Sequence, residues 1–195
     1  MWFTEGVLIL VRHGRTAANA AGVLQGHLDL PLDEVGRAQV RAVAAAIGSV
    51  DRVISSPLGR ARATAAEFGR PVTIDERWIE LDYGEYDGLP LTSVPADAWN
   101  QWSTDTSYST PGGESMGSLD LRVRAACVDA LAAATEERVV VVSHVTPMKA
   151  AVAWALGCDI SIGFRCHLDQ ASVCRIGTGS RGPVLRSFNE VLYRR

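Results

Sequence analysis

Apolar residues follow two alternating patterns along the chain, and the alternation predicts an α/β fold. Short apolar segments typical of strands cover residues 6–11, 51–56, 71–75, 137–143, 171–177 and 183–189. Segments with apolar residues at helical spacing cover residues 33–48, 56–69, 118–135 and 146–157. We therefore expect a three-layer α/β/α sandwich around a mostly parallel sheet with an antiparallel edge.

Capping residues mark where the predicted helices begin and end. Asp33, Ser56 and Thr146 each stand where an N-cap is expected, and a proline directly follows the last two. Gly48 and Gly69 are expected to end the first two helices.

Residues 76–118 have no clear periodicity and are rich in Trp, Tyr, Ser, Thr, Asp, Pro and Gly. A loop-rich segment of this length inside a compact domain is usually functional, so we expect a lid. Trp99 and Trp102 lie three residues apart within it. They would either close over a site or form the core of a short helix, and the sequence leaves both alternatives open.

Chain length, net charge and the length of the apolar runs limit the possible functions. With 195 residues, the chain is long enough for a full core, and we expect residues 1–195 to form a single domain. The net charge of −3 gives no basic field for nucleic acid, so any anion site must be local. Apolar runs fall far short of the ~20 residues of a membrane span, and no membrane partner is expected. An apolar sheet edge would allow a homodimer.

Cysteine usage indicates a reducing compartment. The four cysteines form no CxxC pair and no metal-binding pattern; they are Cys127, Cys158, Cys166 and Cys174. We expect reduced thiols, no metal and no other cofactor. Residues 1–11 lack the basic region and cleavage site of a signal peptide, so the protein is expected to be cytoplasmic. The sequence GTGSRG at 177–182 matches a nucleotide-binding motif, but a strand follows it where that motif needs a helix, so we expect a hairpin turn.

Polar side chains with useful chemistry follow three of the predicted strands. Arg12 and His13 end the first strand, Arg60 follows the second, and His144 ends the strand at 137–143. Because the carboxyl ends of parallel strands meet at one edge, these side chains would converge beside helix N-termini. Guanidinium groups and helix N-termini favour phosphate, so the sequence predicts an anion pocket. Taken singly, each residue is more often structural or solvated.

Five motifs resemble those of the histidine phosphatase superfamily, in its phosphoglycerate mutase-like branch. In chain order they are LVRHGRTAAN, ISSPLGRARATA, IELDYGEYDG, PGGES and VVVVSHVTPMKA, and the resemblance covers residues from about 7 to 156. The resemblance implies the phosphoglycerate mutase-like fold. It also implies that His13 accepts the phosphoryl group, while Arg12, Arg60 and His144 neutralise the phosphoryl oxygens.

The same resemblance implies roles for residues around this core of the site. Asn19 and Thr16 would add neutral donors, and Gly14 would let the chain turn after the histidine. Glu80 would protonate the leaving oxygen and then activate water, for which burial against Trp78 and Tyr83 would suit it. Asp82 is the competitor two residues away.

Three residues depart from the family pattern. Arg15 stands where Glu is common, Val23 where Arg is common, and Val145 where Gly is common. Arg15 and Val145 are therefore expected to contribute to the leaving-group side and to specificity. The sequence SHVTP is similar to that of α-ribazole phosphatases.

These features together predict a phosphatase that hydrolyses a small phosphomonoester through a phosphohistidine. Mutases of the family carry a longer insertion and a C-terminal tail that exclude water, and residues 76–118 are lean by comparison. A phosphoglycerate mutase-type transfer is the alternative. A non-catalytic phosphate-binding module is less favoured, because His13, Glu80 and His144 are all present.

Overall fold

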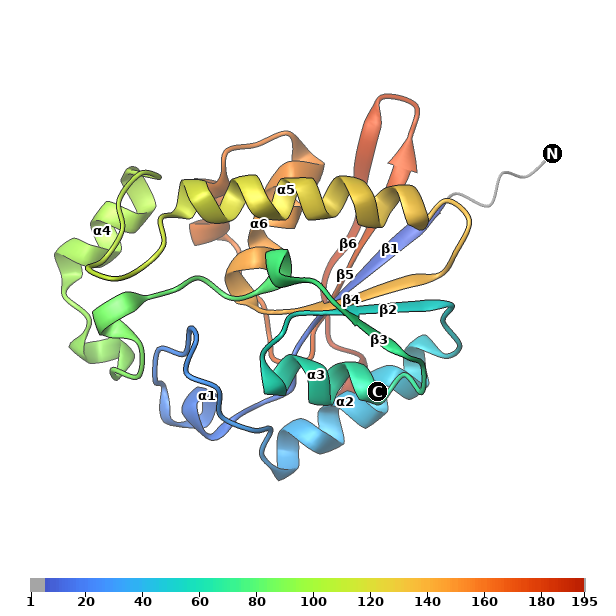
Figure 1. Ribbon diagram of the computed structural model, residues 1–195, viewed down its shortest axis with the longest axis horizontal. Coiled ribbons are helices and arrows are strands. Elements are labelled where there is room, and N and C mark those ends of the chain that lie inside the picture. The colour runs from blue at the N-terminus through green and yellow to red at the C-terminus, as the bar shows by residue number, and fades with distance from the viewer. Residues whose placement is uncertain (1–5, 195) are drawn as a thin grey trace.

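The computed structural model describes residues 6–194, and the prediction that no signal peptide is present falls partly on residues outside this range. Six strands form one sheet in the order β3-β2-β4-β1-β5-β6 (Figure 1). They are β1 (Val7–Arg12), β2 (Arg52–Ser55), β3 (Val72–Ile74), β4 (Val139–Ser143), β5 (Val173–Gly179) and β6 (Gly182–Glu190). The first four pair in parallel, β5 pairs antiparallel with β1, and β6 pairs antiparallel with β5 at that edge of the sheet. The predicted sheet is therefore confirmed.

Four helices cover the two faces of the sheet (Figure 1). They are α2 (Glu34–Ile47), α3 (Gly59–Ala66), α5 (Met116–Ala133) and α6 (Val145–Leu156). Alternate residues of β1 divide between two cores: Leu8 and Leu10 pack on the side of α5 and α6, whereas Ile9 and Val11 pack on the side of α2 and α3. Successive strand residues point to opposite faces, so a continuous apolar run is what a covered sheet requires.

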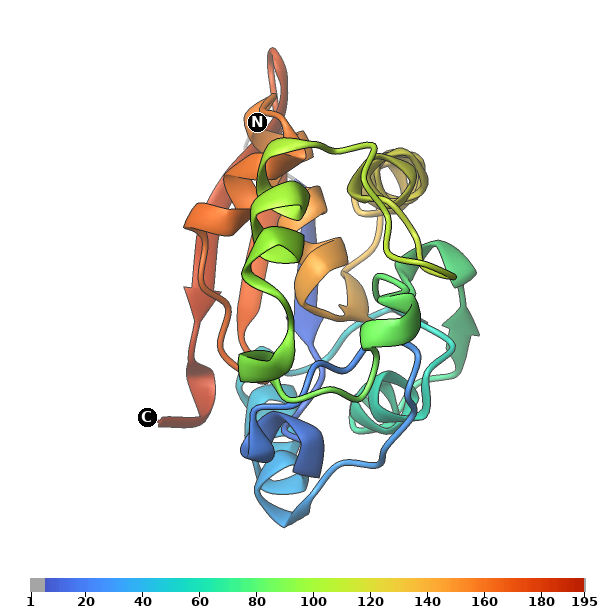
Figure 2. The ribbon, with the colours of Figure 1, turned by 90° about the vertical axis from the view of Figure 1, so that its left-hand side faces the viewer.

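Short elements gather at the carboxyl ends of the parallel strands (Figures 1 and 2). A short helix around Trp99 and Trp102 was one of the two alternatives that the sequence left open, and it is α4; no sequence pattern predicted α1 or the 3₁₀ helix η4. These elements are α1 (Ala17–Ala21), α4 (Ala96–Thr104), η1 (Glu76–Trp78), η2 (Gly84–Tyr86), η3 (Leu91–Ser93), η4 (Ile160–Arg165) and η5 (Leu192–Arg194).

The capping predictions are only partly right. Asp33 caps α2, with its Oδ1 accepting from the Gly36 N–H at 2.7 Å, and Gly48 ends that helix. Ser56 and Thr146 are not N-caps: α3 starts after Leu58 and α6 starts after His144. Both residues bind site side chains instead, as described below.

Two further predictions concern the ends of elements. Helix α3 ends at Ala66 rather than at Gly69. The N–H groups of residues 67–69 donate to carbonyls three residues back, as in a 3₁₀ turn, instead of four residues back. Strands β5 and β6 form the expected hairpin, and Gly182 turns with φ of +121°. The glycine-rich motif is therefore a turn.

All four cysteines are free, with Cys127 and Cys174 buried and Cys158 exposed. Across residues 6–194, no helix has the length and apolar character needed to cross a membrane.

Candidate active site

The sheet order brings the predicted strand ends together. Strand β4 lies between β1 and β2, with Arg12 beside Ser143 and Ser55 beside Val142. The His13 N–H donates to the Ser143 carbonyl at 3.0 Å, which carries the pairing one residue beyond the strand. As a result, the imidazole rings of His13 and His144 lie 5.1 Å apart between centroids.

His13 is buried and is held in its neutral form. Its side chain is almost fully buried, and Nδ1 lies 2.8 Å from the Gly14 carbonyl oxygen. A carbonyl can only accept, so Nδ1 carries the proton and Nε2 keeps a free lone pair. Burial, and then the positive charges of Arg60 and Arg12, hold the pKa of His13 well below its usual 6.5.

His144 is fully buried and is oriented by Ser56. Its Nε2 lies 2.7 Å from Ser56 Oγ, which also accepts from the Leu58 N–H at 3.4 Å. Among the described residues, His144 Nε2 is an acceptor within reach of the Ser56 hydroxyl hydrogen, and a hydroxyl that donates to it leaves neutral His144 with its proton on Nδ1. Burial and the charge of Arg60 hold the pKa of His144 well below 6.5.

Two buried arginines complete the polar end of the site. Arg12 donates through Nη1 to the Leu168 carbonyl at 2.6 Å. Arg60 donates to the carbonyls of Leu28 and Gly26, at 2.9 and 2.6 Å. Burial lowers the pKa of Arg12 to about 10, so the guanidinium stays charged at neutral pH.

Three buried nitrogens of this group have no hydrogen-bond partner among the described residues: Arg12 Nε, Arg60 Nε and His144 Nδ1. Buried polar groups are almost always paired, because an unpaired donor loses its hydration without compensation. These donors belong to residues whose charges act on the His13 ring or whose ring adjoins it. The arrangement suits an anion bound next to His13 Nε2.

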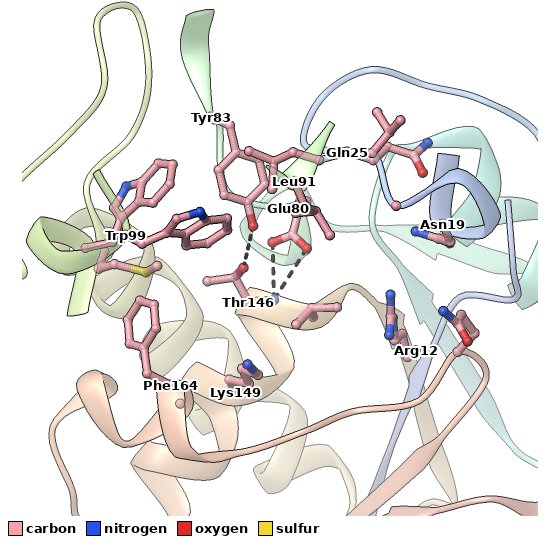
Figure 3. A pocket seen from close by; sticks show the side chains of 18 of the residues that line it. Arg12, Asn19, Gln25, Glu80, Tyr83, Leu91, Trp99, Thr146, Lys149 and Phe164 are labelled. Atoms are coloured by element: carbon pink, nitrogen blue, oxygen red, sulfur yellow. Dashed lines mark hydrogen bonds between the residues drawn. The ribbon is translucent and has the colours of Figure 1, made fainter. Parts of the chain in front are cut away.

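Glu80 is held at the start of α6, facing the cavity (Figure 3). Its Oε1 accepts from the Leu81 N–H at 2.7 Å, and the Thr146 N–H lies 3.2 and 3.4 Å from the two carboxyl oxygens. Tyr83 reinforces this corner, since its hydroxyl lies 3.2 Å from Thr146 Oγ1. Burial raises the pKa of Tyr83, so its phenol is neutral.

Asp82, the competing carboxylate, lies elsewhere. Its Oδ1 accepts from the Gly84 N–H at 2.9 Å, and Oδ2 is 3.6 Å from His27 Nδ1. It is not among the described residues that line the cavity, whereas Glu80 is. The geometry therefore favours Glu80.

Asn19 and Thr16 form a reciprocal cap at the start of α1. Asn19 Oδ1 accepts from the Thr16 N–H at 3.1 Å, and Thr16 Oγ1 accepts from the Asn19 N–H at 3.2 Å. Thr16 is fully buried and donates its hydroxyl to Gln25 Oε1 at 2.7 Å. Asn19 and Gln25 line the cavity, and Thr16 holds both in place.

The remaining predicted residues lie in different surroundings. A Cβ at Gly14 would lie 2.6 Å from the Gly36 carbonyl oxygen, so close packing against α2 requires the glycine. Arg15 binds Asp33 through Nε at 2.8 Å and is not among the described cavity-lining residues. Val145 and Val23 both line the cavity.

The whole cavity has a volume of about 350 Å³, and it continues from His13 into an apolar compartment. Most of this wall was not predicted from the sequence; it includes Leu24, Leu91, Met116, Ile160, Phe164 and Lys149. These residues come from segments far apart in the chain, so local patterns do not connect them. Lys149 alone left a signal, because it lies one helical turn after Val145 on the same face.

Trp99 and Trp102 take both roles that the sequence left open. Trp102 is 1% exposed and meets Tyr83 edge to face at 5.6 Å and Trp99 at 5.2 Å. Both indoles also line the cavity. The aromatic core of residues 76–118 is thus one wall of the site (Figure 3).

Comparisons with known proteins agree with this geometry. A family model described as the histidine phosphatase superfamily (branch 1) matches residues 8–191. Phosphoserine phosphatase 1 of Hydrogenobacter thermophilus is 33% identical over 193 residues, which are 93% of this chain and 91% of that protein.

A solved structure shares the fold. A phosphoserine phosphatase mutant from Entamoeba histolytica, in complex with phosphoserine, superposes with a TM-score of 0.89 at 26% identity, covering 96% of this chain and 98% of that one. The bifunctional protein Rv2228c of Mycobacterium tuberculosis is 35% identical over 176 residues, 85% of this chain but 48% of that protein. The chain therefore spans about half the length of that relative.

Proposed function

The chain belongs to the histidine phosphatase superfamily, and we propose that it hydrolyses a small phosphomonoester with His13 as the phosphoryl acceptor. One observation carries the proposal: a neutral His13 with a free Nε2 adjoins three unpaired buried donors. Relatives named as phosphoserine phosphatases support the phosphatase class.

In the first step, His13 Nε2 attacks phosphorus in line with the leaving oxygen. The phosphorus–oxygen bond to that oxygen breaks, and the Glu80 carboxylic acid gives the oxygen its proton. Arg12, Arg60 and His144 Nδ1 donate to the three equatorial oxygens, where charge is spread in the transition state. The products are an alcohol and phosphohistidine, with Glu80 left as a carboxylate.

In the second step, Glu80 takes a proton from water as the water oxygen attacks phosphorus. The bond between phosphorus and Nε2 breaks, inorganic phosphate leaves, and both His13 and Glu80 return to their starting forms. The hydrogen bond from Nδ1 to the Gly14 carbonyl persists throughout and stabilises the ring in the phosphorylated state.

The experiment is to trap the intermediate with a ³²P-labelled ester. We expect a label on His13 that acid removes and base does not, and no label in His13→Ala. Hydrolysis of p-nitrophenyl phosphate should fall by about four orders of magnitude or more in that variant. An acid-stable label, or turnover retained by His13→Ala, would contradict the proposal. Exchange between 2- and 3-phosphoglycerate without release of phosphate would instead establish the mutase alternative.

A further inference from the structure

Lys149 is the single lysine of the chain and lies in the wall of the cavity. It sits on α6, one turn after Val145 and three residues after Thr146, which line the same cavity. In Figure 3 its amine points into the cavity between Phe164 and Arg12. No step of the proposed hydrolysis uses it.

The stem of Lys149 is held against η4. A Cβ placed on Gly163 would lie 3.1 Å from Lys149 Cβ and 3.4 Å from its Cδ, so the glycine leaves room for this side chain. The stem is therefore fixed by packing, which reduces the entropy lost when the amine binds a ligand.

The charge of the Lys149 amine is not balanced by a direct ion pair within the described residues. Within residues 6–194 no carboxylate forms an ion pair with Lys149. Burial lowers the pKa of Lys149, while the nearby groups Glu80 and Cys166 act to raise it. A desolvated cation without a partner is unfavourable, and an anion bound in the cavity would remove that cost.

The surroundings of the amine are apolar. The compartment beyond Glu80 is lined by Trp99, Trp102, Met116, Ile160 and Phe164. Its volume places the cavity at the lower end of the range of pockets that hold drug-sized ligands, about 300–1,000 Å³. This is more apolar surface than a short polar acid can cover, so the bound leaving group needs an apolar body as well as a charge.

We propose that Lys149 binds a carboxylate on the leaving group, and that the preferred substrates are phosphomonoesters of apolar or aromatic carboxylic acids. This inference rests on the proposed phosphatase function. Lys149 is in this view a specificity residue, since it contacts the substrate away from the reacting phosphorus.

The test uses esters that differ only in charge. Meta- and para-carboxyphenyl phosphate are compared with the corresponding carbamoylphenyl phosphates, which have the same shape without the charge. In Lys149→Met, the ratio of kcat/KM for the acid over the amide should fall about tenfold or more, as expected for a charged hydrogen bond. Lys149→Arg should retain most of the ratio. Arg62→Met removes an exposed charge from α3 and should change the ratio by less than about twofold.

A second measurement does not depend on a variant. In the wild-type protein, carboxybenzylphosphonates should inhibit with a Ki about tenfold or more below that of the carbamoyl analogues. Equal Ki values, or a ratio of kcat/KM that Lys149→Met leaves unchanged, would overturn the role of Lys149. Hydrolysis of p-nitrophenyl phosphate but of neither ester would overturn the substrate class, whereas failure on all of these esters would refute the phosphatase proposal instead.

Discussion

The two halves of the cavity are built in different ways. The phosphate half groups Arg12 and His13, which line the cavity, with Arg60 and His144, which lie behind them and are not among its described lining residues; all four are nearly or fully buried. The leaving-group half takes its walls from residues 76–118, from α6 and from η4, and is mostly apolar. Backbone hydrogen bonds between strands position the first half, whereas side-chain packing positions most of the second.

This difference separates the groups proposed for the reaction from those that would select among esters. Strand ends fixed in one sheet hold charged groups to within the tolerance that phosphoryl transfer needs. A wall of packed aromatic residues can change its shape without disturbing that geometry. Changes in the phosphate half should therefore affect all esters alike, and changes in the other half should affect them selectively.

The largest effect is expected from Arg60→Met. Removing this proposed donor to the phosphoryl oxygens should lower kcat/KM about a thousandfold, by a similar factor for every ester. Arg62→Met, on the exposed face of the same helix, is the matched control and should stay near wild type. Because Arg60 also binds the Leu28 and Gly26 carbonyls, the stability of the variant should be measured by urea unfolding alongside the kinetics. A loss of kcat/KM confined to one class of ester would contradict the division of roles between the two halves of the cavity.

Glu80→Gln probes the boundary between the halves. The amide cannot protonate the leaving oxygen, so kcat for alkyl phosphates should fall about a hundredfold or more. The first step with p-nitrophenyl phosphate should suffer less, because nitrophenolate leaves without a proton. Asp82→Asn serves as the control, and steady-state assays on both esters provide the measurement. If Asp82→Asn is the more damaging change, the acid is assigned to the wrong carboxylate.

A pH dependence of stability should follow from the two buried histidines. Above about pH 6.5 both are neutral in the folded and the unfolded chain, and they add no slope. Below it only the unfolded chain takes up their protons, because the folded pKa values lie well below 6.5. The free energy of unfolding should then fall by up to about 2.7 kcal/mol per pH unit until the folded pKa values are reached.

Urea unfolding across this pH range measures the slope. His13→Gln should reduce it by about half, since one of two groups is removed. His167→Gln removes an exposed histidine and should leave the slope in place. An equal slope in all three proteins would contradict this assignment.

The smallest effect is expected from Ser56→Ala. Loss of one hydrogen bond to His144 should lower kcat/KM about five- to tenfold, and Ser56→Thr should restore most of it. Nitrogen NMR of the His144 ring distinguishes orientation from general damage: the wild-type ring should carry its proton on Nδ1. A proton on Nε2 in the wild-type protein would show that Ser56 does not act in this way.

Local patterns predicted the elements of the sheet well. The apolar run of β1 and the helical spacing of α2 are properties of neighbouring residues, so the sequence shows them directly. The convergence of Arg12, His13 and His144 also followed, because parallel strands share one edge for their carboxyl ends. The family motifs added Glu80, which no periodicity marks.

Contacts between distant segments escaped prediction. Ser56 and Thr146 looked like helix caps, but their partners His144 and Glu80 are 88 and 66 residues away. Arg15 was expected to contribute to specificity, and the fold ties its guanidinium to Asp33. Each outcome depends on which polar group lies nearest after folding.

The sequence by itself determined the order of strands and helices along the chain. It also determined which residues stand at the strand ends, because periodicity is a property of neighbouring residues. Only the tertiary structure decided the second half of the cavity. Packing of α4, α6 and η4 put Trp99, Trp102 and Lys149 around one space. Nothing in the spacing of these residues specifies their contact, since it arises when surfaces from separate segments exclude water together.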